Sequence, residues 1–454
     1  MSTEQDHQDR DGRMPSDTPQ VLPPPAHRYE RSLTMLRRAE RVIPLGSQTF
    51  SKSRTQFPLG ASPLFMERAC GCEVWDVDGN AYVDFICSLG AITLGHGHEE
   101  VRKAVCRQVE RGVLFSLASP LEHEVAELIV QEVPCAEMVR FGKNGSDATA
   151  GAIRLARAWT GRDHVAVCGY HGWQDWYIGS TARHRGVPQA TRALTHRFGY
   201  NDIDSLHALL QRYPGELAAV IMEPVSFEEP RDGFLHAVRE LCDREGIVLI
   251  FDEVVTGFRL APGTAQALYG VTPDLATIGK GLGNGFPISA VVGRADMMRL
   301  MEEVFFSFTM GGEAVSLAAA KTVLEVARRE NLYGHFLTIG CHLKKGVQTL
   351  IRQAGLQEVL SLQGHPSWTL LQFADTQAGS ALELKTLYMQ ECLRRGILTF
   401  GVHFLMQAHE MEHVQKLLQV YEEVFDILKH ALASGNIAQY LHCKPLEPLF
   451  KVRS

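Results

Sequence analysis

The sequence lacks the features that mark several large classes of protein. No apolar run approaches the ~18 residues of a membrane-spanning helix, and the polar N-terminus has no signal-peptide core. The formal net charge is −7 and basic residues form no runs, so the electrostatic footprint of a protein that binds nucleic acid or membranes is missing. We therefore expect a cytoplasmic protein with neither nucleic-acid nor membrane partners.

The cysteines lack any metal-ligand or disulfide pattern. None of the ten forms a CxxC motif, and Cys70 and Cys72 have no second pair with which to build a zinc site. His96 and His98 have no acidic partner motif, so they are expected to mark a loop and a helix start. We therefore expect no metal, and most thiols should be small core side chains. The ten are Cys70, Cys72, Cys87, Cys106, Cys135, Cys168, Cys242, Cys341, Cys392 and Cys443.

Length and composition predict more than one domain. The 454 residues, 45% of them hydrophobic, can bury large cores. We divide the chain into a disordered tail (1–26), an N-terminal segment of a small lobe (27–95), a large domain with the binding motifs (96–332), a C-terminal small domain (333–435) and a C-terminal extension (436–454). The tail is polar and proline-ended, which is the composition of a disordered segment.

The middle of the chain alternates strand and helix patterns, which predicts an α/β fold. Apolar runs of strand length end at Glu223 and at Asp252, and a helical pattern lies between them. Such alternation favours a mostly parallel sheet with helices on both faces. Open sheets of this kind bind ligands at the carboxyl edge of their strands. Both acids are therefore expected at a ligand-binding edge.

Asp252 and Lys280 are the most informative pair of residues. Lys280 ends a second short apolar run and is flanked by Gly279 and Gly281, which let a bulky ligand approach. A lysine amine can hold an aldehyde as a Schiff base, and a buried carboxylate can keep a pyridine nitrogen protonated. Pyridoxal phosphate needs both. The alternative, a strand-capping aspartate and a solvated loop lysine, is disfavoured by the surrounding residues.

Two further segments could complete a cofactor site. Gly145 and Ser146 lie where a strand pattern gives way to an alanine-rich helix, so their N–H groups and hydroxyl could cradle a phosphate. The alternative is a plain helix cap made by Ser146 or Asp147. Aromatic residues after the next strand could stack on a flat ring or pack in the core. They are Tyr170, Trp173, Trp176 and Tyr177.

A loop near residue 50 is rich in hydroxyl, amide and cationic side chains. Ser47, Lys52 and Arg54 could face an anionic substrate. The alternative is an ordinary surface loop. From the residues alone, both interpretations stay open.

The motifs FDEVVTGFR (251–259) and TPDLATIGKGLGNGFP (272–287) resemble the class-III, or subgroup III, pyridoxal-phosphate-dependent aminotransferases of fold type I. The resemblance covers about residues 35–430. VWDVDGNAYVDF, LGHGHEEV, NGSDAT, YHGW and YNDID look closest to the branch that contains glutamate-1-semialdehyde 2,1-aminomutase. It implies a large domain with a mostly parallel sheet flanked by helices, and a smaller lobe built from both ends of the chain.

The resemblance also implies roles for individual residues. Lys280 would form the Schiff base and shuttle the substrate proton, and Asp252 would pair with the pyridinium nitrogen. Val254 and Tyr170 would cover the two faces of the ring. The remaining implied site residues are Gly145 and Ser146 at the phosphate, Glu223 and His171 near the cofactor, and Thr309, which would reach the phosphate of a neighbouring subunit in a homodimer with shared active sites.

Several positions depart from the family pattern. Lys143–Asn144 stands where the family usually has asparagine–serine, and Ser146–Asp147 replaces threonine–glutamate. Residues 225–229 replace a small segment that ends in asparagine in the aminomutase. The loop between residues 177 and 201 is basic, whereas the aminomutase has a small, apolar gate loop. Its basic residues include Arg183, His184, Arg185, Arg192 and His196.

These departures bear on the reaction. An intramolecular aminomutase needs a gate that closes tightly over a small substrate, whereas a basic loop favours a larger, anionic one such as a phosphorylated or nucleotide-linked sugar. We therefore predict an aminotransferase that moves an amino group from a small-molecule donor to a carbonyl acceptor. The alternative is a glutamate-1-semialdehyde 2,1-aminomutase that forms 5-aminolevulinate. A non-enzymatic role would require the loss of Lys280 or Asp252, and both are present.

Overall fold

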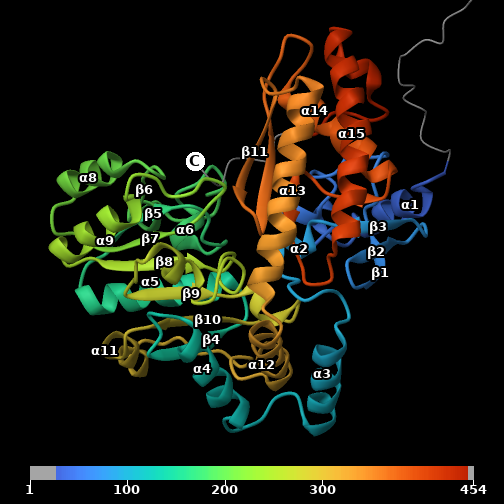
Figure 1. Ribbon diagram of the computed structural model, residues 1–454. Helices are drawn as coiled ribbons and strands as arrows, with labels where there is room; N and C mark the ends of the chain where they lie inside the picture. Colours follow the sequence, from blue (N-terminus) through green and yellow to red (C-terminus); the bar gives the residue numbers. More distant parts are fainter. Residues whose placement is uncertain (1–26, 448–454) are drawn as a thin grey trace, which may run out of the picture.

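A seven-stranded sheet is the largest feature of the computed structural model, which describes residues 27–447 (Figure 1). Its strand order is β4-β10-β9-β8-β7-β5-β6, and β10 alone runs antiparallel to its neighbours. The prediction of an α/β fold with a mostly parallel sheet is confirmed. The strands are β4 (Met138–Gly142), β5 (His164–Cys168), β6 (Thr195–Arg197), β7 (Leu217–Met222), β8 (Val248–Glu253), β9 (Leu275–Ile278) and β10 (Ser289–Gly293).

Helices bury both faces of this sheet. All residues of β7 and β8 are buried, as expected for parallel strands covered on two sides. Alternate side chains enter different cores: Leu249 and Phe251 pack with α9 (Phe234–Glu245), whereas Val248 and Ile250 pack with α5 (Gly145–Thr160). Successive side chains of a strand point to opposite faces of the sheet, so the apolar residues of β8 pack against helices on both faces.

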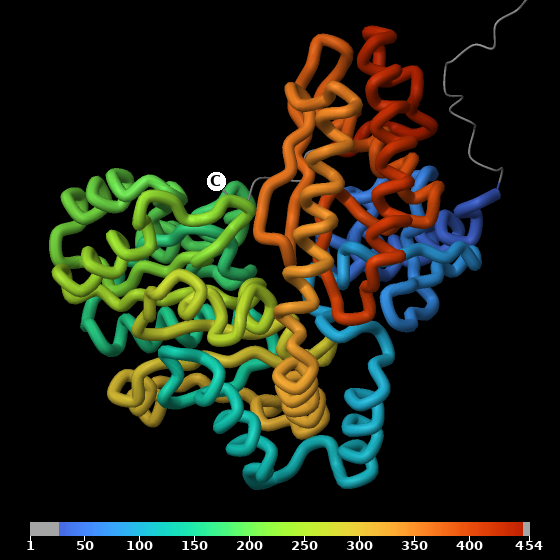
Figure 2. The backbone as a smooth tube through the Cα atoms, in the orientation of Figure 1, coloured from blue at the N-terminus to red at the C-terminus, as the bar shows by residue number. Residues whose placement is uncertain are grey.

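The two ends of the described chain fold together into a smaller lobe. Strands from the N-terminal part form a sheet of order β1-β2-β3-β13, in which β13 pairs in parallel with β3. A second sheet has the order β11-β12-β14. Figure 2 shows the blue and red segments side by side, and one core cluster joins them. The strands are β1 (Met66–Cys70), β2 (Glu73–Asp76), β3 (Ala81–Asp84), β11 (Leu360–His365), β12 (Trp368–Phe373), β13 (Ile397–Leu398) and β14 (Val402–Phe404).

The remaining helices connect the strands and build the lobe. The α-helices are α1 (Glu30–Ala39), α2 (Cys87–Gly90), α3 (Glu99–Arg111), α4 (Pro120–Glu132), α6 (Asp175–Ile178), α7 (Gln189–Arg192), α8 (Ile203–Arg212), α10 (Thr264–Tyr269), α11 (Ala295–Met298), α12 (Ala314–Arg329), α13 (Leu332–Ala354), α14 (Ala381–Arg394) and α15 (Met411–Ala433). The 3-10 helices are η1 (Pro44–Gly46), η2 (Phe50–Lys52), η3 (Lys280–Gly283), η4 (Arg299–Glu302) and η5 (Ile437–Tyr440).

Two predictions concern residues that the structure does not describe. The tail (1–26) and the last part of the C-terminal extension (448–454) lie outside the described residues. Within residues 27–447, no helix combines the length and the apolar character that a bilayer span requires.

Candidate active site

Three neighbouring parallel strands place the predicted catalytic residues at one edge of the large sheet. Glu223 directly follows β7, Asp252 lies near the end of β8, and Lys280 follows β9 after Gly279. β8 pairs in parallel with both β7 and β9, so these strand ends share the carboxyl edge. The fold therefore brings the three residues to the edge where ligands bind in such sheets.

Asp252 is held by hydrogen bonds to both of its carboxylate oxygens. The buried His171 ring lies 2.7 Å from Oδ2 through its Nδ1 atom. Oδ1 accepts from the hydroxyl of Thr277 at 3.1 Å and from the backbone N–H of Val254 at 3.2 Å. The carboxylate is only 4% exposed. Its position is thus fixed by residues from three different elements before any ligand binds.

The partnership of His171 with Asp252 was not foreseen from the sequence, which predicted His171 only as a neighbour of the stacking aromatic. Its other ring nitrogen, Nε2, is buried and has no hydrogen-bond partner among the described residues. With Nδ1 donating its proton to the carboxylate, the ring would keep negative charge on Asp252 available for a cation. A protonated pyridine nitrogen is such a cation.

The first turn of α5 packs directly against the strand that carries Asp252. A Cβ atom at Gly145 would lie 2.8 Å from a methyl group of Val254, so a side chain would crowd this contact. Ser146 touches Gly172, where a Cβ would lie 2.6 Å from the serine Cβ. Gly145, Ser146 and Val254 are thus neighbours in space, as the cofactor interpretation requires.

The capping alternative for this turn is also partly correct. The carboxylate of Asp147 accepts from the backbone N–H groups of Lys143 at 3.1 Å and Asn144 at 2.8 Å. It thereby shapes the turn between β4 and α5. This turn ends at a helix N-terminus, where backbone N–H groups favour an anion such as a phosphate.

The aromatic residues after β5 divide between two roles. Trp176 and Tyr177 are buried in a core cluster, which confirms core packing for these two. Tyr170 is 38% exposed, its ring meets Tyr177 edge-on at 5.7 Å, and its backbone N–H donates to Glu223 at 3.1 Å. Trp173 is 67% exposed. Tyr170 is therefore the aromatic ring that stands at the strand edge beside Glu223.

The turn that carries Lys280 is held by a loop from the smaller lobe. Lys280 and Asn284 both have positive φ angles, 42° and 45°, which cost free energy in residues with a side chain. The Asn284 side chain accepts from the N–H groups of Thr93 and Leu94, at 2.8 and 2.9 Å, and donates to the carbonyl of Gly95 at 3.0 Å. The glycine-rich pattern near residue 95 was the sequence signal for this loop, but it did not identify Asn284 as its partner.

The predicted substrate residues lie on loops that meet at one point. The guanidinium of Arg183 lies 5.3 Å over the ring of Phe50, which joins the basic loop to the N-terminal loop. Lys52 is exposed, and the hydroxyl of Ser47 donates to the carbonyl of Thr49 at 3.3 Å. Arg54 contacts Glu40 through Nε and Oε1 at 2.5 Å, so its charge has an acidic partner within the chain.

His196 does not belong to the basic loop, contrary to the sequence interpretation. It lies on β6, where its ring stacks on Tyr213 at 4.1 Å and contacts His164 through a nitrogen–nitrogen distance of 2.7 Å. Burial, together with the nearby charge of His164, lowers the pKa of His196 to about 4. Its ring therefore adds no positive charge to the loop near neutral pH.

Thr309 lies on the exposed segment between η4 and α12. Its neighbours Phe308 and Met310 are 36% and 51% exposed. Hydrogen bonds between this segment and the rest of the chain are made by the Phe305 and Phe306 carbonyls and by Glu313. Thr309 itself is exposed, whereas the side chains that hold Asp252 are buried.

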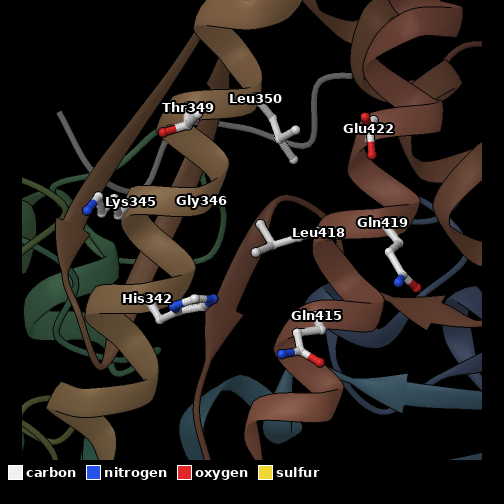
Figure 3. Close-up of a pocket in the computed structure, with 9 residues that line it drawn as sticks. All are labelled: His342, Lys345, Gly346, Thr349, Leu350, Gln415, Leu418, Gln419 and Glu422. Carbon is white, nitrogen blue, oxygen red and sulfur yellow. The ribbon is translucent and has the colours of Figure 1, made fainter.

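Outside the sheet edge, the described residues form a groove but no metal-binding cluster. Among residues 27–447, no group of three or more histidine, cysteine, aspartate or glutamate side chains is arranged to hold a metal ion. A groove of about 480 Å³ is lined by residues of α13 and α15 (Figure 3). In that view Leu350 and Leu418 lie between the two helices, and none of the predicted site residues lines the groove.

Comparison with known proteins agrees with this geometry. The family described as "Aminotransferase class-III" matches residues 57–432. The chain is 32% identical to a 3-aminobutyryl-CoA aminotransferase of Cloacimonas acidaminovorans (strain Evry), over 88% of this chain and 98% of the relative. It is 36% identical to a glutamate-1-semialdehyde 2,1-aminomutase of Alkaliphilus oremlandii (strain OhILAs), over 87% and 98%.

A solved structure shows the same fold with the cofactor in place. The FumI protein of Sphingopyxis sp. MTA144, determined in its pyridoxal-phosphate internal aldimine form, superimposes with a TM-score of 0.82 at 30% identity, covering 89% of this chain and 98% of that one. The residues at the sheet edge fit this cofactor, since a fixed carboxylate, a lysine and a helix N-terminus converge there. The chain belongs to the class-III aminotransferases, which are pyridoxal-phosphate-dependent enzymes of fold type I.

Proposed function

We propose that this protein moves an amino group from a separate small-molecule donor to a carbonyl acceptor that carries an anionic group. The observation that supports the chemistry best is the Asp252 carboxylate, fixed by His171 and Thr277 on the strand next to the Lys280 turn. When bound, pyridoxal phosphate supplies an aldehyde carbon that takes up an amine and a ring that stores electrons.

Each residue at the edge has a defined task in this proposal. Asp252 holds the proton on the pyridine nitrogen, and His171 and Thr277 keep the carboxylate oriented. Lys280 would hold the aldehyde carbon, and its amine would move the proton at the substrate Cα atom. Val254 and Tyr170 would lie against the ring. The phosphate is held by Gly145 and Ser146, and Glu223 orients the groups beside Tyr170.

The charge around the meeting point of the two loops supports an anionic acceptor. Arg183 and Arg185 are exposed, and Lys52 is exposed on the adjoining loop. Exposed cationic side chains favour phosphate or carboxylate groups on a ligand. We therefore include phosphorylated, nucleotide-linked and thioester-linked carbonyl compounds among the acceptors, the last because one relative is named for a CoA-linked substrate.

An exposed apolar surface supports the homodimer. Phe305, Phe308 and Met310 flank Thr309, and Leu114, Phe115 and Leu117 are exposed on the loop between α3 and α4. A backbone hydrogen bond of 2.9 Å from Ala314 to Val113 joins the two segments. Large exposed apolar patches mark interaction surfaces. We propose that this surface pairs with its copy, so that Thr309 reaches the phosphate of the partner subunit. The cytoplasmic location expected from the sequence is part of the same proposal.

The second candidate is glutamate-1-semialdehyde 2,1-aminomutase activity, since several similar proteins carry that name. One assay separates the candidates. Purified protein loaded with pyridoxal phosphate is given L-glutamate alone, or glutamate-1-semialdehyde alone. Release of 2-oxoglutarate from glutamate, limited to one turnover until a carbonyl acceptor is added, is the expected result. Formation of 5-aminolevulinate from the semialdehyde alone would instead assign the aminomutase reaction.

A further inference from the structure

We name the segment from Phe305 to Glu313 the strap. Hydrogen bonds hold it against β4 and α5 of the same subunit, and the turn between these two elements contains Gly145 and Ser146, which we name the phosphate cradle. The Arg154 guanidinium, from α5, donates to the carbonyl of Phe305 at 2.7 Å, and Arg140 of β4 donates to the carbonyl of Phe306 at 3.2 Å. The Phe306 ring packs over α5 where a Cβ at Gly151 would lie 3.0 Å from it. The strap therefore lies along the strand and helix whose junction contains Gly145 and Ser146.

An ion pair fastens the far end of the strap to the cradle itself. The Lys143 ammonium donates to the Glu313 carboxylate at 2.9 Å, and the two side chains are only 14% and 13% exposed. Lys143 immediately precedes Asn144, the N-cap of the helix that begins at Gly145. The Coulomb attraction between two such shielded charges is stronger than in an exposed surface pair, because water and salt screen it less.

Glu313 is also the N-cap residue of the next long helix, α12. Its Oε1 atom accepts from the N–H of Val315 at 2.7 Å, so the same carboxylate caps α12. Burial opposes its ionisation, but hydrogen bonds from Ser316 and Lys143 outweigh burial, and the pKa of Glu313 is lowered. The charged Glu313 side chain thus contacts both Lys143, next to the cradle, and the first turn of α12, and Glu313 is itself the last residue of the strap.

We infer that Lys143 and Glu313 are positioning residues that couple the cofactor sites of the two subunits. Each subunit's strap is fixed to its own phosphate cradle, while the strap presents Thr309 to the other subunit's phosphate. Occupation of one site then steadies the Thr309 that serves the other site. This inference rests on the proposed function, in which the protein is a dimer and Thr309 acts across the interface.

The first test measures cofactor affinity of the unpaired variants. Lys143→Met and Glu313→Gln remove one charge each, and the glutamine keeps an oxygen that can still cap α12. We expect each to weaken pyridoxal-phosphate binding by about tenfold in equilibrium dialysis, with the double variant no weaker than either single one. Lys143→Arg should restore most of the affinity.

A matched control separates positioning from general stability. Lys321 of α12 forms a more exposed pair with Glu124 of α4, at 2.7 Å, away from the strap; these side chains are 35% and 37% exposed. Lys321→Met should therefore lower the melting temperature by no more than Lys143→Met does, and it should leave cofactor affinity unchanged. Equal affinities for Lys143→Met and wild type would overturn the inference. A wild-type protein that binds no pyridoxal phosphate would instead overturn the proposed function.

The second test asks whether the effect crosses the interface. Differently tagged chains give mixed dimers in which one subunit carries Lys280→Ala, so that only the other retains cofactor covalently. Lys143→Met placed in the Lys280→Ala subunit is expected to weaken cofactor retention in the intact subunit by about tenfold. Unchanged retention, or a wild-type protein that is monomeric in sedimentation velocity, would contradict the coupling.

Discussion

Asp252 depends on partners that come from distant parts of the chain. The strand pattern places this aspartate at the ligand edge, but the rings and hydroxyls that hold it come from the turn after β5 and from β9. Its neighbour Glu253 points to the other face, where Thr256, Thr264, Ala265 and Gln266 donate to it. Two adjacent carboxylates on one strand therefore have separate tasks, one at the ligand edge and one inside the fold.

Replacement of Asp252 by asparagine tests the first task. The amide keeps the shape and can still accept from Thr277, but it cannot hold a cation on the pyridine nitrogen. Turnover should fall by about 10²–10³-fold with the fold intact, measured as steady-state amino transfer. Glu253→Gln is the matched control, because it removes a neighbouring charge outside the site and should affect thermal stability more than turnover. Wild-type turnover in Asp252→Asn would refute the proposed role.

Lys280 is the residue whose loss should end the reaction. Lys280→Ala should lower turnover by at least about 10³-fold, because no other amine takes its place at the aldehyde carbon. Borohydride reduction followed by mass spectrometry should find cofactor attached to a Lys280 peptide in wild type and on no peptide in the variant. Lys344→Ala, in the smaller lobe, should keep the label. Covalent cofactor at a second lysine would show that the assignment is wrong.

The first residue of helix α5, Gly145, leaves room for the side chain of Val254. Gly145→Ala would place a methyl group 2.8 Å from Val254, so either the helix or the strand end must move. We expect a loss of about 1–3 kcal/mol in the free energy of unfolding, and weaker cofactor retention. Urea denaturation and equilibrium dialysis measure the two effects.

The comparison variant for this test is Gly346→Ala. A Cβ there would lie 2.6 Å from Leu418, where α13 meets α15 far from the sheet edge. It should lower stability by a similar amount without changing cofactor retention. Equal retention by both variants would show that the Gly145 contact serves packing alone.

The elements of the large sheet were predictable because each rests on a local pattern. Apolar runs ending in acids predicted β7 and β8, and the glycine–serine sequence predicted the start of α5. Contacts between distant residues leave no such pattern. The Asn284 clamp and the Lys143–Glu313 pair each join segments far apart in the chain. The prediction that His196 lies in the basic loop is wrong for the same reason. His196 belongs to the short strand β6, whose pairing with β5 joins residues far apart in the chain.

The large domain and the smaller lobe are joined through a buried cation. Arg259 is 1% exposed and donates to the carbonyl groups of Leu405 at 2.8 Å and Gly90 at 3.1 Å. Burial lowers its pKa to about 10. Because it follows the Asp252 strand within the FDEVVTGFR motif, it links the sheet edge that carries Asp252 to both chain segments of the lobe.

Buried histidines should make the whole molecule acid-labile. Burial lowers the pKa of His403 and of His409 to about 3. Between pH ~6.5 and ~3 the unfolded chain therefore binds protons that the folded chain does not, so stability falls as the pH falls. Each histidine contributes a slope of up to about 1.4 kcal/mol per pH unit.

Urea denaturation between pH 7 and pH 5 measures this slope. His403 contacts Thr369 and Tyr421, and His403→Asn should reduce the pH dependence even though it lowers stability at pH 7. His342→Asn, at an exposed position on α13, should leave the slope unchanged. An identical slope in His403→Asn and wild type would contradict the assignment.

The parallel pairing of β13 with β3 also orders events during synthesis. The edge of β3 has no partner until Ile397 and Leu398 have left the ribosome, by which time the entire large sheet has emerged. The large sheet can therefore fold first. Until the C-terminal part of the smaller lobe has been synthesised, the apolar side chains of β2 and β3 stay exposed to solvent. A chain stalled or cleaved before residue 397 would expose these apolar side chains to chaperones and proteases, even though the strands that carry Asp252 and Lys280 had been synthesised.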